Sequence, residues 1–287
     1  MKIVIIIFTF ILTITITKGQ ISEQKQTQVS KPFVFGKIDE IQSKILNEKR
    51  VLNIYLPEGY NQNDSTIYSV IYLLDGSADE DFIHIAGLVQ FNNFEWVNLI
   101  PKSIVVGIAN IDRERDFTFP TSVSEQKIRF KRSGHSDKFI SFIENELQPY
   151  IDSNYKTNSN NTIIGQSLGG LLASEILIKK PQLFNNFIIV SPSLWWDNGS
   201  LLNYNFNTFS EKINSQINIY IAVGKEGLTP TEIPRVMEVD ANKLADKIKE
   251  LKNNHINLFF DYLPKENHAT ILHQAVLNSF RFLSNKK

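Results

Sequence analysis

The segment that most constrains the fold runs from Thr162 to Leu177 and joins a short β-branched strand, a tight turn and a helical pattern. The turn reads GQSLG (165–169), which is a G-x-S-x-G pattern. Between a strand and a helix this pattern predicts a nucleophile elbow, where the serine backbone is strained and small flanking residues let strand and helix close. We therefore expect Ser167 to be a nucleophile above the amino end of the next helix. The alternative is an ordinary serine in a glycine-rich loop.

Strand-like apolar runs alternate with helical patterns along most of the chain. Two strands joined through 47–49 come first, and further runs follow at 67–74, 103–108, 161–165, 186–190, 217–223 and 257–262. Apolar residues recur with helical spacing at 138–148, 168–180, 240–253 and 269–283. Nearly continuous apolar strands that alternate with helices predict an α/β fold with a mostly parallel sheet covered on both faces. A chain of 287 residues without repeats or internal linkers fits one such domain.

The first residues differ from the rest of the chain. Lys2 precedes an apolar run that ends at Thr17, and Gly19 is small, so residues 1–19 are predicted to be a secretory signal peptide. The run is short for a membrane-spanning helix, although an amino-terminal anchor is the alternative. We expect export to the periplasm or the medium, a polar flexible leader over 20–32, and the folded domain over 33–287.

Charge and cysteine content exclude several classes of function. The chain has 30 basic and 30 acidic side chains, so its net charge gives no argument for a nucleic acid or an anionic membrane as partner. It has no cysteine, which excludes disulfides, thiolate metal sites and lipid attachment through cysteine. The exported chain must rely on its core alone for stability.

A histidine and a carboxylate follow later strands, where ligands of α/β sheets bind. His268 lies after the run at 257–262, in the chain order serine, acid, histidine, and is the expected general base. Glu226 follows the run at 217–223 and is the expected acid that orients the imidazole. Glu238 and Asp240 compete for that role, and a dyad without an acid is also open.

Backbone amides near the serine are candidates for an oxyanion hole. The turn Asp75-Gly76-Ser77 follows the run at 67–74, and its glycine lets the backbone approach a substrate. We expect the amide of Ser77 or Gly76, together with that of Leu168, to bind the acyl oxygen. An ordinary Asp-Gly turn is the alternative.

Several motifs together resemble the esterase family of α/β-hydrolases that includes the enterobactin and bacillibactin esterases, esterase D-like enzymes, feruloyl esterase domains and mycolyltransferases. The resemblance covers roughly residues 33 to 285. The motifs are GQSLGG (165–170), LLDG (73–76), SPSLWW (191–196), DRERD (112–116) and NH (267–268). The resemblance implies ester hydrolysis without metal or organic cofactor. It places the nucleophile on Ser167, the base on His268 and the oxyanion amides on Ser77 and Leu168; the acid position holds Glu rather than Asp.

Two long inserts are expected to shape the pocket. Residues 78–101 are apolar enough to form a helix over the site, and residues 111–136 form a long charged flap. The flap contributes Arg113 and Arg115 as substrate-binding candidates, while Trp195 and Trp196 stand at the rim, where they either stack on a substrate ring or cover the core.

The sequence thus predicts an exported serine esterase that acts on a small-molecule ester through an acyl-enzyme. The siderophore-esterase resemblance makes a siderophore ester a candidate substrate, and carbohydrate esters are another. An acyltransferase of the same fold and a non-catalytic hydrolase-like protein that binds siderophores or other ligands are the alternatives. The oligomeric state is left open.

Overall fold

A computed structural model of the protein describes residues 30–284. The predicted signal peptide and most of the leader lie outside the described residues, so both stay predictions. The compact unit that carries the site begins at Phe35. None of the helices within residues 30–284 is long and apolar enough to cross a membrane.

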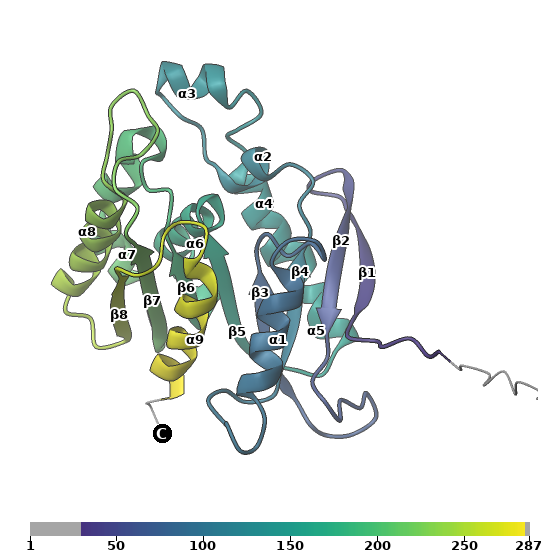
Figure 1. Ribbon diagram of the computed structural model, residues 1–287. Coiled ribbons are helices and arrows are strands. Elements are labelled where there is room, and N and C mark those ends of the chain that lie inside the picture. The colour runs from purple at the N-terminus through teal and green to yellow at the C-terminus, as the bar shows by residue number, and fades with distance from the viewer. Residues whose placement is uncertain (1–29, 285–287) are drawn as a thin grey trace, which may run out of the picture. The chain divides into compact units, whose positions relative to one another are not determined.

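The centre of this unit is a sheet of eight strands in the order β1-β2-β4-β3-β5-β6-β7-β8 (Figure 1). β1 is antiparallel to β2 and β2 to β4, whereas all later neighbours pair in parallel. The strands are β1 (Lys37–Ser43), β2 (Glu48–Tyr55), β3 (Tyr68–Leu73), β4 (Ser103–Ile108), β5 (Thr157–Gln166), β6 (Asn186–Val190), β7 (Ile217–Gly224) and β8 (Ile256–Leu263). The predicted mostly parallel sheet of an α/β-hydrolase fold is confirmed.

Helices cover both faces of the sheet, and each face has its own hydrophobic cluster. The α-helices of seven or more residues are α1 (Phe82–Asn92), α4 (Ser136–Phe142), α5 (Gln148–Asn154), α6 (Leu168–Lys179), α8 (Met237–Glu250) and α9 (Ile271–Ser284). The shorter α-helices are α2 (Arg113–Phe117), α3 (Ser124–Arg129) and α7 (Phe206–Glu211), and the π- and 3-10-helical segments are η1 (Ile143–Leu147), η2 (Pro181–Leu183) and η3 (Trp196–Asn203). The larger cluster joins one face of the sheet to the run from α4 to α5 and to α6, α7 and α8. The smaller cluster joins the other face to α1 and α9. Central strands between two apolar layers explain why their sequences are almost continuously hydrophobic.

One predicted helix end is wrong. The sequence pattern ends the helix over 138–148 near residues 149–151, but α4, η1 and α5 follow one another without a break to Asn154. Pro149 lies in the first turn of α5, directly after the π-helical turn η1. A proline inside a helical run removes one helical hydrogen bond, and the π-helical turn directly before Pro149 is where this run departs from the regular α-helical pattern.

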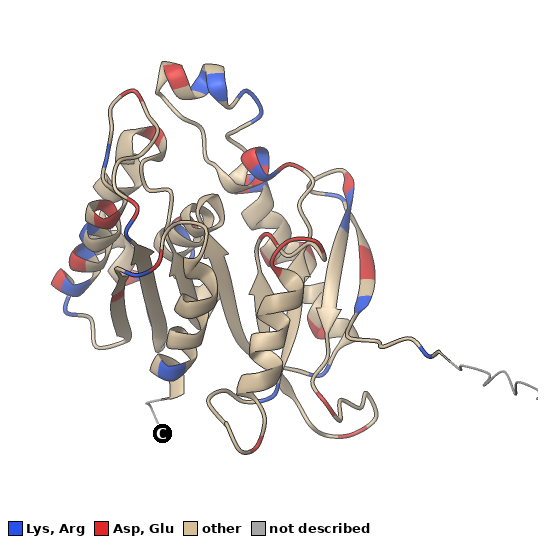
Figure 2. Ribbon diagram, in the orientation of Figure 1, with Lys and Arg blue, Asp and Glu red and all other residues tan. Residues whose placement is uncertain are grey.

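The insert at 78–101 does not form the expected lid. Its helix α1 buries Phe82, Ile85 and Val89 in the smaller cluster and packs on β4 and α9. The apolar residues that suggested a lid are therefore a sheet-covering face. Only the loop that precedes α1 reaches the site, and Figure 2 shows acidic residues on that loop.

Candidate active site

Ser167 occupies a strained turn between β5 and α6. Its backbone angles are φ 60° and ψ −118°, in the left-handed region that residues other than glycine rarely adopt. The amide of Ser167 donates to the carbonyl of Val190 at 3.1 Å, which ties the turn to the end of β6. A Cβ on Gly165 would lie 2.4 Å from the carbonyl oxygen of Gly169, so this position requires glycine. This is the elbow geometry that the sequence pattern predicts.

Glu226 and His268 meet at the same end of the sheet, on the loops after β7 and β8. Nδ1 of His268 lies 2.6 Å from Oε2 of Glu226. The Glu226 side chain is 4% exposed and the His268 side chain is 47% exposed. The imidazole is thus held at Nδ1 by a buried carboxylate, which leaves its Nε2 available to a second partner.

The Glu226 carboxyl is stabilised in its ionised form. Burial acts to raise its pKa, but hydrogen bonds from His268 and Ser191 outweigh burial and bring the pKa below the ordinary value. The two competing carboxylates have other partners. Glu238 accepts the amides of Glu226 and Gly227, and Asp240 pairs with Arg235.

Two cavities meet at Ser167 and His268. The first has a volume of about 290 Å³ and is mostly apolar. Besides that pair it is lined by Ser193, Trp195, Glu226, Leu228, Thr229, Pro230 and Met237. The second has a volume of about 410 Å³ and is polar. It is lined further by Asp75, Glu80, Asp81, Arg113 and Gln166. A substrate that fills both cavities would therefore lie against the hydroxyl of Ser167.

The serine hydroxyl is paired with another serine rather than with the histidine. Oγ of Ser167 lies 3.4 Å from Oγ of Ser193, and no hydrogen bond within residues 30–284 joins Ser167 to His268. Hydrogen bonds between a nucleophile and its base are often long before substrate binds. The loop of His268 is nevertheless fixed beside the elbow, because the side chain of Gln166 donates to the carbonyl of His268.

Two of the three amides expected in the oxyanion hole are free to donate to a substrate. Leu168 is the first residue of α6, so its N–H has no partner inside the helix. In the part of the chain that the structure describes, neither this amide nor that of Ser77 donates a hydrogen bond to the protein. The amide of Gly76 donates to the carbonyl of Ile108 at 3.1 Å, which removes Gly76 from the expected set.

Comparison with known proteins places this geometry in a family. Residues 43–261 match the family described as "Putative esterase". The chain belongs to this esterase family. Ferri-bacillibactin esterase BesA of Bacillus subtilis (strain 168) is 31% identical over 251 residues, which are 82% of this chain and 86% of that protein.

Solved structures share the fold of this esterase. An IroE-like serine hydrolase from Shewanella oneidensis superposes with a TM-score of 0.76 at 31% identity, over 87% of this chain and 80% of the other. The BES protein from Bacillus cereus has a TM-score of 0.76 at 27% identity, over 90% of this chain and 98% of its own. Hydrolysis of small-molecule esters is the activity that the family and these relatives support.

The esterase uses its two flap arginines differently. Arg113 binds both carboxylate oxygens of Asp75, at 2.7 and 3.0 Å, and reaches the polar cavity. Arg115 instead donates to Glu48 and Asp116 and lines neither cavity. The guanidinium of Arg115 thus joins α2 to β2, and contact of Arg115 with substrate stays a prediction.

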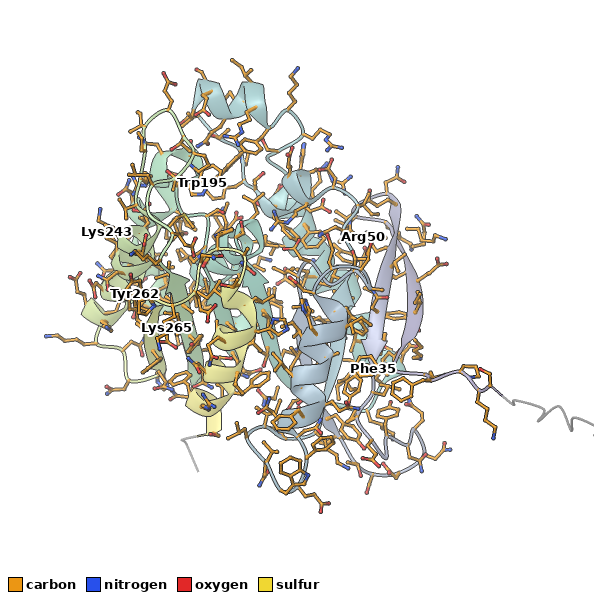
Figure 3. All side chains as sticks on the ribbon, in the orientation of Figure 1. Phe35, Arg50, Trp195, Lys243, Tyr262 and Lys265 are labelled. Atoms are coloured by element: carbon orange, nitrogen blue, oxygen red, sulfur yellow. The ribbon has the colours of Figure 1, made fainter. Side chains whose placement is uncertain are left out.

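The two tryptophans also lie in different surroundings. Trp195 lines the apolar cavity, and Figure 3 shows it at the end of the sheet that faces α3. Trp196 is 0% exposed, and its indole N–H donates to the carbonyl of Phe119 at 2.8 Å. The expectation that Trp196 binds substrate is wrong, since this side chain belongs to the core.

Several residues of the site are not predicted from the sequence. Ser193 and Thr229 are polar residues that line the apolar cavity, and Leu228 and Met237 form part of its apolar wall. Ser191 donates a hydrogen bond to the carboxylate of Glu226. The SPS run after β6 contributes to the family resemblance, and serines after a strand carry no further signal. Among the described residues, no group of three or more His, Asp or Glu side chains is placed to hold a metal ion.

Proposed function

We propose that the protein is a serine esterase in which Ser167 is the nucleophile, His268 the general base and Glu226 the residue that orients the imidazole. One observation carries the proposal. The strained serine and a histidine paired with a buried carboxylate line the same two cavities. This constellation is the recurring arrangement for acyl transfer to serine.

The reaction follows from these positions. Oγ of Ser167 attacks the ester carbonyl while Nε2 of His268 takes its proton, and the amides of Leu168 and Ser77 stabilise the oxyanion. The tetrahedral intermediate collapses, the alcohol leaves with the proton from His268, and an acyl-enzyme remains. Water, deprotonated by the same imidazole, then releases the acid and restores Ser167. Glu226 stays ionised and stabilises the imidazolium in both steps.

We propose a siderophore ester as the substrate. BesA is named a ferri-bacillibactin esterase, and other relatives from Aspergillus fumigatus and Emericella nidulans are named siderophore esterases over shorter matches. An apolar wall with Trp195 beside a polar cavity with Arg113 suits a substrate that joins aromatic and charged parts. We also propose that the protein is exported, because the sequence of residues 1–19 predicts a secretory signal peptide.

The first test compares wild type with Ser167→Ala, both produced from Gln20 onward, in the hydrolysis of p-nitrophenyl butyrate. Loss of the nucleophile is expected to lower kcat by several orders of magnitude with little effect on unfolding. A fluorophosphonate is expected to label the wild type and not the variant. Equal turnover by the two proteins would contradict the proposal. Release of free acid rather than a transferred ester separates hydrolysis from acyl transfer.

A further inference from the structure

The two oxygens of the Glu226 carboxylate have different partners. Oε2 faces Nδ1 of His268 at 2.6 Å, whereas Oε1 accepts the hydroxyl of Ser191 and the amide of Gly224, the latter at 3.3 Å. The side chain is only 4% exposed, so these protein groups supply most of its hydrogen bonds. Which way the carboxylate turns is therefore decided by the groups on Oε1.

Ser191 is built into the fold directly after β6. It is fully buried, its backbone has φ 43°, and its amide donates to the carbonyl of Ala222 in β7 at 2.7 Å. This left-handed turn directs the hydroxyl toward the loop of Glu226, where it makes its hydrogen bond. Ser191 lines neither cavity that contains Ser167, so it does not touch a substrate there.

A glutamate in the acid position needs such a partner. Compared with aspartate, glutamate has one more rotatable bond, so its carboxylate can reach several orientations from the same backbone. The backbone of the loop is held separately, because Glu238 accepts the amides of Glu226 and Gly227. Glu238 thus fixes where the loop lies, and the orientation of the side chain is left to the donors on Oε1.

We propose that Ser191 is a positioning residue for the esterase. Its hydroxyl donates to Oε1 of Glu226 and so turns Oε2 toward Nδ1 of His268. The ring then keeps the proton on Nδ1 and presents a basic Nε2 to Ser167. The inference rests on the proposed function and deepens it.

The test is a double-mutant cycle between Ser191→Gly and Glu226→Ala, with p-nitrophenyl butyrate as substrate. Glycine removes the hydroxyl but permits the positive φ, so the fold is expected to survive. Ser191→Gly alone is expected to lower kcat about 10- to 100-fold with KM unchanged, because the base is misplaced. In the Glu226→Ala background the same change is expected to cost nothing further.

Two controls separate positioning from packing. Ser279→Ala removes another fully buried hydroxyl, bonded to Val276 in α9, and is expected to leave kcat unchanged. Ser191→Ala is expected to lose as much activity as Ser191→Gly, although its backbone preference differs. The downfield proton resonance of Nδ1 of His268 is expected to shift upfield in both Ser191 variants.

Three outcomes would overturn the inference. These are wild-type kcat in Ser191→Gly, an equal loss in the Glu226→Ala background, and an unchanged Nδ1 resonance. Failure of the proposed function looks different, since Ser167→Ala would then turn over at the wild-type rate whatever Ser191 does.

Discussion

At the scale of single residues, each polar side chain of the candidate site is held by hydrogen bonds to particular neighbours. Glu226 is the clearest case, because its burial is offset by donors on both oxygens and its pKa falls below the ordinary value. A carboxylate stabilised in this way contributes to folding only while it is ionised. Its contribution is therefore readable from the pH dependence of stability.

We expect Glu226→Gln to lower the free energy of unfolding at pH 7 by about 1 to 3 kcal/mol, as for hydrogen bonds to a charged group. In the wild type the pKa is lowered from 4.5 on folding, so this stability is present above pH 4.5 and is lost as the pH falls through the lowered pKa. Denaturant unfolding at several pH values should show the difference between the two proteins shrink below pH 4.5. A difference that stays constant down to pH 3 would contradict this account.

At the scale of elements, charged side chains join the flap to the sheet. Arg50 of β2 is fully buried and donates to Asp116 of α2 at 2.8 Å, and Arg115 donates to Asp116 and Glu48. Burial acts to raise the pKa of Glu48, but the two arginines bring it below the ordinary value. Beyond α2 the basic side chains of the flap are exposed while Thr118 and Gln126 are buried, and Figure 2 shows both signs of charge on α3. The network thus fixes the base of the flap and keeps Arg113 beside the site.

We expect Asp116→Ala to lower the free energy of unfolding by about 2 to 3 kcal/mol, because the buried cation of Arg50 loses one of its two carboxylate partners and keeps only Glu48. Arg132→Ala is the matched control on the same insert. Arg132 is 70% exposed and pairs with Asp112 at 3.2 Å, so its loss is expected to cost less than about 1 kcal/mol. Chemical denaturation of the two variants measures both values, and equal costs would show that burial of the pair does not matter.

At the scale of the whole molecule, the sheet separates two apolar layers and gathers the loops of the site at one end. The layers are unequal, and Trp196 belongs to the larger one together with α6 and α8. Its neighbour Trp195 is only partly buried and faces the cavity. Of these two adjacent tryptophans, Trp196 thus contributes to the core and Trp195 forms part of the cavity wall.

We expect Trp196→Ala to lower the free energy of unfolding by about 3 to 5 kcal/mol, since it removes a large side chain from a packed core. Trp195→Ala is expected to cost clearly less stability and to raise KM for aromatic esters, because it removes cavity wall. Denaturation and steady-state kinetics on the two variants test this division. A rise in KM for Trp196→Ala alone would contradict it.

Periodicity and turn chemistry were enough to predict the sheet, the helices α4, α6, α8 and α9, and the elbow at Ser167. Each of these depends on neighbours within a few residues, such as glycines around a strained turn or alternating apolar runs. Chain order along the strands also brought His268 and Glu226 to the same end of a parallel sheet, because the carboxyl ends of parallel strands share one edge.

Side-chain partners were decided only by the tertiary structure. The sequence cannot tell Trp195 from Trp196 or Arg113 from Arg115, since burial and pairing depend on residues as far as 77 positions away. The composition of the insert at 78–101 predicts a lid for the same reason, because a helix face that covers a sheet and one that covers a ligand have the same composition. The role of Ser191 is the plainest example. A serine after a strand has no signal of its own, and only the approach of β7 brings its hydroxyl to Glu226.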